Sequence, residues 1–272
     1  MQALRTTTIF VLSVIATLFI ATFVLAASAP TAPLSLVQGA SSTFNELNYP
    51  ALNVSAIAGN ITWLTIEGIS QTRAWQGYYG NVTGYITLDD VNNYTFYNWS
   101  AANPRGFLYA TLASRPTVSW LDVNCFTANA ADASTFQTFY NISQDDYDNV
   151  TNTYNVTLNT LPTPQVVYIV NNSFPDCPAT TIWQNDLYQS ENFVNYLMKD
   201  RTGGNDAWVF GTILENKNIS TRQQIPCYNG ELCDFQLLVA ENGHGTDTAV
   251  TQYYFWVDLT GCARSARPGA GS

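Results

Sequence analysis

The sequence predicts an all-β fold, mainly antiparallel, of the immunoglobulin-like or a related β-sandwich type, with one or two short helices. Short runs rich in β-branched and aromatic residues recur along the chain, and 14% of all residues are aromatic. Gly, Asn, Asp and Pro separate these runs at short intervals, which is typical of strands and turns in a sandwich. Behind the N-terminal segment the sequence shows no long periodic helix and no repeat of roughly 20–50 residues.

The clearest pair of predicted strands is a hairpin. Residues 84–88 and 94–99 bracket the turn sequence Asp-Asp-Val-Asn-Asn. An earlier strand is expected over residues 61–66, and an aromatic one over residues 74–79. Further strands are expected over residues 106–112, 118–123, 165–170, 207–214, 235–239 and 252–259. Short helices are expected over residues 132–140 and 145–152.

Residues 1–29 predict an apolar helix. Arg5 is the only charged residue before Glu46, and residues 6–29 are dense in Ile, Val, Leu and Phe. This length lies between a signal-peptide apolar region of about 7–15 residues and a membrane-spanning helix of about 20. The segment is therefore either a cleaved signal peptide or a retained N-terminal membrane anchor. A pilin-type leader is a third alternative, although the sequence lacks the glycine usual at its cleavage junction.

The rest of the chain divides into three parts. Residues 30–56 are rich in Pro, Ala and Ser and predict a linker. Residues 57–262 contain the strand signals and predict the β-sandwich ectodomain, as one domain or as two sub-domains. Residues 263–272 predict a flexible tail.

Ten Asn-x-Ser/Thr sequons, none with proline in the middle position, predict N-glycosylation of an exported chain. Only 11% of the residues are charged, against about 25% in an average soluble domain, and attached glycans would supply the missing solvation. The location predicted by these features is extracellular or at the cell surface. The acceptor residues are Asn53, Asn60, Asn81, Asn93, Asn98, Asn141, Asn149, Asn155, Asn171 and Asn218.

Charge and sequon placement bear on the expected partners. The net charge of −10 argues against nucleic acid, because binding to phosphates rewards basic patches. Only Asn218 lies after residue 171, so the C-terminal strands would be the sugar-poor part of the chain. Residues 253–257 are apolar on both faces, which predicts either a buried central strand or an interface strand. Expected partners are other envelope proteins or glycans, together with self-association through the C-terminal strands; a membrane is expected only through an uncleaved N-terminal segment.

Five cysteines in an exported chain predict disulfides. Cys227 and Cys233 flank an Asn-Gly turn signal, so a bridge across that hairpin is expected. Cys125 and Cys177 would then pair over a long loop. Cys262 is left as an odd cysteine, either free or intermolecular. Zinc is not expected, because the chain has no CxxC motif and a single histidine.

Three sequence blocks carry a resemblance. They are Ala-Trp-Gln-Gly-Tyr-Tyr-Gly-Asn-Val-Thr-Gly at 74–84, the run at 106–125 that ends in Cys125, and Asp-Phe-Gln-Leu-Leu-Val-Ala-Glu-Asn-Gly-His-Gly followed by Tyr-Tyr-Phe-Trp-Val at 234–257. In this order they resemble a group of secreted or cell-surface archaeal proteins with no assigned activity. The resemblance covers about residues 60–260 and implies an archaeal origin, export and a Cys125–Cys177 bridge; Cys227, Cys233 and Cys262 depart from the pattern.

No catalytic residue is predicted. The single histidine, His244, lies in Gly-His-Gly, which favours a turn over the base of a nucleophile triad. Asp145, Asp146 and Asp148 are candidates for calcium, although solvated acids at a helix start are the plainer interpretation. No other metal or cofactor is expected.

Two further groups of residues are weighed as sugar-related sites. Glu67, Asp122, Glu231, Asp234 and Glu241 show no spacing diagnostic of a glycosidase pair. The aromatic group at 75–79 could form a platform for sugars, but packing within a sheet is the preferred interpretation.

Together these features predict an exported, N-glycosylated, disulfide-stabilised cell-surface module with a structural or adhesive role and no catalytic activity. Two alternatives stay open: a subunit of an extracellular filament, and an extracellular carbohydrate-binding protein or hydrolase.

Overall fold

A computed structural model describes residues 29–42, 53–68, 70–101, 105–127, 130–170, 172–184, 187–188, 192–215, 225–242 and 250–260. Within these ranges every pair of named strands is antiparallel, and the helices are short. The prediction of an all-β, mainly antiparallel fold is therefore confirmed. The predicted N-terminal helix and C-terminal tail lie outside the described residues.

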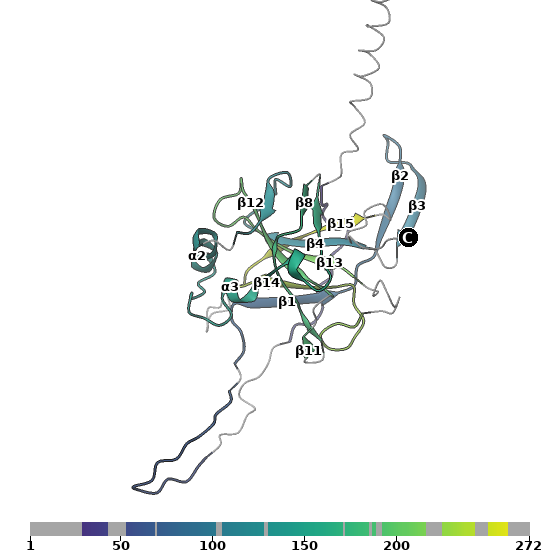
Figure 1. Cartoon of the computed structure of the whole chain (residues 1–272). Coiled ribbons are helices and arrows are strands. Elements are labelled where there is room, and N and C mark those ends of the chain that lie inside the picture. Colours follow the sequence, from purple (N-terminus) through teal and green to yellow (C-terminus); the bar gives the residue numbers. More distant parts are fainter. Residues whose placement is uncertain are drawn as a thin grey trace, which may run out of the picture.

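A seven-stranded sheet forms the centre of the molecule (Figure 1). Six strands follow one another in the order β15-β4-β13-β12-β9-β6, and the short strand β5 also pairs with β12. The strands are β15 (Tyr253–Thr260), β4 (Arg105–Leu112), β13 (Trp208–Leu214), β12 (Asn195–Asp200), β9 (Pro178–Thr180), β6 (Val156–Thr157) and β5 (Val123–Cys125).

Both faces of this sheet are buried. Along β4, Leu108 and Ala110 contribute to one apolar cluster, while Phe107 and Tyr109 contribute to the other. Side chains alternate in the same way along β13 and β12, because successive residues of a strand point to opposite faces. A strand buried on both faces needs a nearly continuous apolar sequence, and all seven residues of β13 are buried.

The first face is covered by a two-stranded ribbon and two helices. The ribbon pairs β1 (Trp75–Gly80) with β14 (Phe235–Ala240), and the helices are α2 (Ala130–Phe139) and α3 (Val150–Thr153). Phe136 of α2 packs its ring 5.1 Å from Trp208 of the sheet and 6.0 Å from Trp75 of the ribbon. These aromatic contacts join helix, ribbon and sheet into one core.

One buried side chain joins the ribbon to the sheet through hydrogen bonds. Asn195 of β12 is fully buried; its Nδ2 donates to the carbonyl oxygens of Phe193 (2.8 Å) and Gln236 (3.0 Å). Its Oδ1 accepts from the backbone N–H of Leu238 at 2.7 Å. The amide group therefore pairs with β14 as another backbone strand would, and satisfies backbone polar groups at the buried junction of ribbon and sheet.

The second face is covered by short strands and loops. The hairpin of β7 (Val167–Ile169) and β8 (Asn172–Phe174) and the 3-10 turn η2 (Leu158–Thr160) supply its apolar side chains. A disulfide between Cys125 and Cys177 ties β5 to this layer across 52 residues of sequence. A second disulfide joins Cys227 to Cys233 across a turn. Both predicted bridges are thus present, and Cys262 lies outside the described residues.

The first part of the predicted linker belongs to the folded domain. Pro30 is buried, and Thr31 pairs with Val257 of β15 through two backbone hydrogen bonds of 2.8 and 2.9 Å. Composition alone predicts a linker here, because Pro, Ala and Ser do not favour a β-strand. The outer edge of β15 gives Thr31 a backbone partner, so the start of the predicted linker is attached to the domain.

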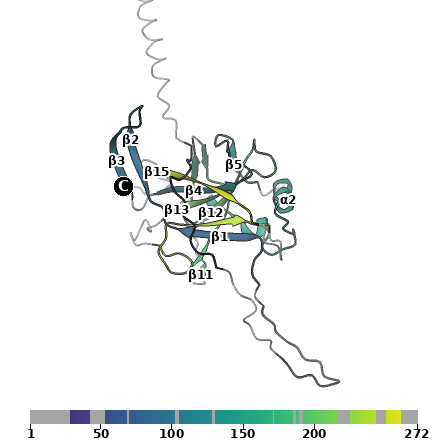
Figure 2. The same ribbon diagram turned by 180° about the vertical axis from the view of Figure 1, so that it is seen from behind.

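Two elements leave the body at opposite ends (Figures 1 and 2). At one end stands the hairpin of β2 (Gly84–Asp89) and β3 (Thr95–Ala101), which is paired only with itself. From the other end extends the segment of residues 53–68, here called the arm, whose described residues form no helix or strand. A smaller hairpin, β10 (Trp183–Gln184) with β11 (Leu187–Tyr188), completes the described strands.

Three local predictions are wrong. Residues 61–66 are exposed in the arm and form no strand, because no neighbouring strand pairs with them. Residues 118–122 form turns before β5, and their carboxylate and hydroxyl groups bond to each other across the turn. The helix predicted over 145–152 starts only after Asn149, whose side chain caps α3 by accepting from the N–H of Asn152.

The Asn195 bridge makes a stability prediction. Replacing Asn195 with Ala leaves a buried N–H and two buried carbonyl oxygens without a partner, so we expect a loss of about 3 kcal/mol in the free energy of unfolding. Urea denaturation followed by tryptophan fluorescence measures it. The control Asn124→Ala, at an exposed asparagine, should change stability by less than about 0.5 kcal/mol. Equal effects of the two substitutions would contradict the role given to Asn195.

Candidate functional site

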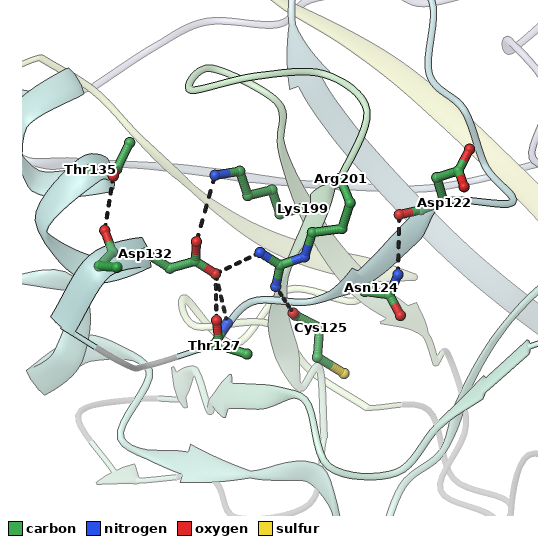
Figure 3. Close-up of polar contacts among 9 residues, drawn as sticks. Asp122, Asn124, Cys125, Thr127, Asp132, Thr135, Lys199 and Arg201 are labelled. Atoms are coloured by element: carbon green, nitrogen blue, oxygen red, sulfur yellow. Dashed lines mark hydrogen bonds and ion pairs between the residues drawn. The ribbon is translucent and has the colours of Figure 1, made fainter.

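The densest group of charged side chains in the described residues surrounds Asp132 of α2. Figure 3 shows its carboxylate facing Lys199 and Arg201, with Thr127 on the same side. The Arg201 guanidinium donates to Asp132 at 2.8 Å and to the carbonyl oxygen of Cys125 at 2.8 Å, and the Lys199 ammonium lies 3.6 Å from Asp132. Lys199 also sits 4.5 Å above the ring of Trp208.

The electrostatics of this group are those of a structural ion pair. Burial alone would raise the pKa of Asp132, but hydrogen bonds from Thr127 and Arg201 outweigh it and lower the pKa to about 2. A carboxylate held ionised in this way cannot act as a general acid near neutral pH. The cluster instead fixes α2 to β12 beside the Cys125–Cys177 bridge.

The calcium candidates are not brought together as ligands. The Asp146 carboxylate accepts from the N–H of Ser143 at 2.8 Å, whereas the Asp148 carboxylate accepts from the Thr72 hydroxyl. Asp145 is exposed. Among the described residues, no three His, Cys, Asp or Glu side chains form a group that could hold a metal ion.

The carboxylates considered for a hydrolase are engaged separately. Asp234 accepts from the N–H of Val82 at 2.8 Å, Glu231 from Asn229 at 3.0 Å, and Glu241 from Thr251 at 3.2 Å. Each bond stabilises a local turn or a contact between layers. His244 lies outside the described residues.

A pocket of about 390 Å³ lies beside α2, between the helix and the loop that follows it. Its lining is Ser134, Gln137, Thr138, Asn141, Ile142, Ser143 and Gln144. None of these side chains titrates near neutral pH. The lining therefore offers hydrogen-bonding groups, but no acid or base and no base that could activate a serine or threonine as a nucleophile. Asn141 is also the acceptor of a sequon, and a glycan attached there would stand at this pocket.

The aromatic side chains of β1 pack mainly against other side chains of the fold. Trp75 packs against Phe136 and Tyr154, and its indole N–H donates to the carbonyl oxygen of Asp148 at 2.7 Å. Tyr78 packs edge-on against Phe255 of β15. Only Tyr79 of this group is exposed, so packing within the fold, the preferred interpretation, is confirmed.

The sequon asparagines are mostly at the surface. Eight of the ten lie among the described residues, and seven of these are exposed: Asn53, Asn60, Asn81, Asn93, Asn98, Asn141 and Asn155. Asn93 and Asn141 have φ values of 62° and 52°, the left-handed conformation that asparagine tolerates in turns. Asn171 and Asn218 lie outside the described residues.

Asn149 is the exception. Its side chain is only 4% exposed, and its Nδ2 donates to the carbonyl oxygens of Gln144 and Asp146, both at 2.8 Å. The Thr151 hydroxyl of the same sequon donates to Asn149 Oδ1 at 2.7 Å. A glycan bonded to this buried Nδ2 would replace one of its two hydrogen bonds to the carbonyl oxygens of Gln144 and Asp146, so the folded chain disfavours the modification that the sequence motif predicts.

Two elements expose several large apolar side chains. The first is the β2–β3 hairpin, where Leu88, Tyr97 and Trp99 are each about half exposed. The second is the arm, where Ile61 and Trp63 are almost fully exposed. Sequence reasoning predicted the hairpin but missed its isolation, and placed the arm residues inside a sheet.

The part of the chain that the structure describes contains no helix long and apolar enough to cross a membrane. Comparison with known proteins gives no match to a family model, to a curated protein or to a solved structure.

The Asp132 cluster makes a pH-dependent prediction. Because the pKa of Asp132 lies below its ordinary value of 3.8, its ionised form stabilises the fold above pH 4, and this contribution is lost as the pH falls toward 2. The lowered pKa, discounted for the solvent screening of a partly exposed group, leads us to expect that Asp132→Asn costs about 1–2 kcal/mol of unfolding free energy at pH 7.

Urea titrations between pH 7 and pH 2 measure the difference between the variant and the original chain, which should shrink below pH 4. The matched change Asp145→Asn removes an exposed carboxylate and should alter stability by less than about 0.5 kcal/mol. A cost for Asp132→Asn that stays constant down to pH 2 would refute the ion-pair account.

Proposed function

We propose that this chain is an exported, N-glycosylated module of the cell surface, with a structural or adhesive role and no catalytic activity. The proposal includes the archaeal origin implied by the resemblance of its sequence blocks. Its partners are other envelope proteins, envelope glycans or further copies of the chain.

The observation that carries the proposal is the pair of disulfides. Both bridges stabilise the fold at places where regular hydrogen bonding is sparse: Cys125–Cys177 fixes the irregular layer, and Cys227–Cys233 closes a turn. Disulfides persist in oxidising compartments and are rare in a reducing cytoplasm. They therefore support export of the folded domain.

The distribution of sequons supports the same conclusion. Seven exposed acceptor asparagines are spread over the arm, the hairpin and the loops of the first layer. With 11% charged residues the bare surface would be weakly solvated, and glycans at these positions would add solvation and hinder proteases.

The described carboxylates support a structural role over catalysis. Asp234 and Asp146 accept hydrogen bonds from neighbouring backbone N–H groups, and the Asp132 carboxylate is held ionised by hydrogen bonds from Thr127 and Arg201. A hydrolase needs acids and bases that converge on one substrate atom. The filament alternative draws support from a different observation, the exposed apolar side chains of the arm and the hairpin.

Glycopeptide mass spectrometry on the protein secreted by its native host tests the proposal. We expect modification at several of the seven exposed sequons and none at Asn149, because its Nδ2 and its cap are already engaged. Non-reducing digestion of the same sample should release Cys125–Cys177 and Cys227–Cys233 as linked peptides.

The internal control is Asn155, an exposed sequon only six residues from Asn149. Modification at Asn155 with none at Asn149 would attribute the difference to burial. A chain found in the cytoplasm with free thiols and bare sequons would overturn the proposed function.

A further inference from the structure

The pocket beside α2 contains a buried polar group that the fold does not use. One side of the helix and its C-terminal end supply four of the lining residues at helical spacing: Ser134, Gln137, Thr138 and Asn141. Gln137 is only 6% exposed, and its Nε2 is a buried donor without a hydrogen-bond partner among the described residues. Such a donor costs free energy, so its place in a pocket wall points to an acceptor that enters from outside.

Asn141 is held in this lining by the way α2 ends. Its φ of 52° is the left-handed conformation in which helices commonly terminate. The N–H of Ile142 donates to the carbonyl oxygen of Gln137 at 2.9 Å, and the N–H of Asn141 donates to that of Thr138 at 3.4 Å. These two bonds form a Schellman motif, which fixes the backbone that carries the exposed Asn141 side chain.

The loop after the helix forms the other wall and is held by its own hydrogen bonds. The Ser143 N–H donates to the Asp146 carboxylate at 2.8 Å, and the Ser143 hydroxyl accepts from the N–H of Asp145 at 3.2 Å. The Asn149 Nδ2 donates to the carbonyl oxygen of Gln144 at 2.8 Å. A wall that is already ordered lowers the entropy cost of holding a ligand.

The chemistry of the lining favours an uncharged, hydroxylated ligand. The lining residues carry amide and hydroxyl groups and no charge, and Ile142 adds an apolar surface for C–H groups. The volume of about 390 Å³ lies at the small end of the range of about 300–1,000 Å³ for ligand sites. A neutral sugar ring has this combination of hydroxyl and C–H groups. The terminal torsion of Gln137 is broad, so its amide can turn toward an oxygen of the ring at little cost.

We propose that this pocket holds the first sugar of a glycan on Asn141, and that the Gln137 Nε2 donates a hydrogen bond to an oxygen of that sugar. The inference rests on the proposed N-glycosylation and assigns one of its glycans a place in the fold. The first sugar is bonded to Asn141, which itself lines the pocket. A tether this short gives an effective concentration on the order of millimolar, which favours the attached sugar over a free one.

The contact gives this glycan a role that an unsupported glycan lacks. One net hydrogen bond changes the unfolding equilibrium constant by about fivefold. The glycan on Asn141 should therefore stabilise the fold, beyond adding solvation. Asn81 provides the comparison, because it is an exposed sequon asparagine outside the pocket lining.

A double-mutant cycle on the full chain secreted by its native host tests the contact. Ser143→Ala removes the hydroxyl that the sequon requires, so Asn141 stays in place without its glycan. Gln137→Met replaces the amide by an apolar group of similar length. In urea titrations each change alone should raise the unfolding equilibrium constant at least about fivefold. The two together should raise it no more than Ser143→Ala alone, because Gln137 then has no sugar to bond.

Two matched variants separate the glycan from the side chain that is changed. Ser143→Thr keeps both the sequon and a hydroxyl, and should change the constant less than about twofold. Thr83→Ala removes the glycan from Asn81 and should also change it less than about twofold. Glycopeptide mass spectrometry identifies the acceptor that has lost its sugar in each variant.

Three results would overturn the inference: Gln137→Met as costly without the Asn141 glycan as with it, no effect of Gln137→Met on the glycosylated chain, or equal effects of Thr83→Ala and Ser143→Ala. An unmodified Asn141 beside a modified Asn81 would also overturn it, while leaving the proposed function standing. A cytoplasmic chain with every sequon bare would overturn the proposed function itself.

Discussion

The structure depends on a central sheet whose two faces must both be covered. Strands β4, β13 and β12 carry large apolar side chains on each face, and the chain has few charges with which to solvate them. Two separate layers therefore pack on the sheet, one tied to it by the Asn195 amide and the other by the Cys125–Cys177 bridge. The Asp132 cluster adds a third tie, between α2 and β12.

This arrangement accounts for the apolar residues of the body and sets apart those of the hairpin and the arm. Once the sheet is covered on both faces, Trp63 and Trp99 have no core left to enter. The large apolar side chains left exposed by this arrangement gather on two projecting elements.

The parts of the fold that sequence reasoning predicted are those whose residues fit a single local pattern. The hairpin at 84–101, β4, β13, β14 and β15 are all rich in β-branched or aromatic residues. Strand β12 was missed because Asn195, Lys199 and Asp200 give it a polar sequence, and these residues are the ones that bond to other layers. Residues 61–66 have the sequence pattern of a strand but no partner strand in the described chain. Asn149 lies in a sequon, but its amide is buried. Whether a strand forms or an amide is accessible depends on tertiary contacts, which a local sequence pattern does not contain. One signal of the Asp132 cluster is present in the sequence: Lys199 is one of only two lysines in the chain.

Hydrogen–deuterium exchange tests most directly the central claim that the sheet is closed on both faces while the hairpin and the arm lie outside it. Amides of β4, β13 and β12 should exchange slowly, and those of residues 61–66 and 84–101 quickly. Central strands that exchange as fast as the arm would contradict this account.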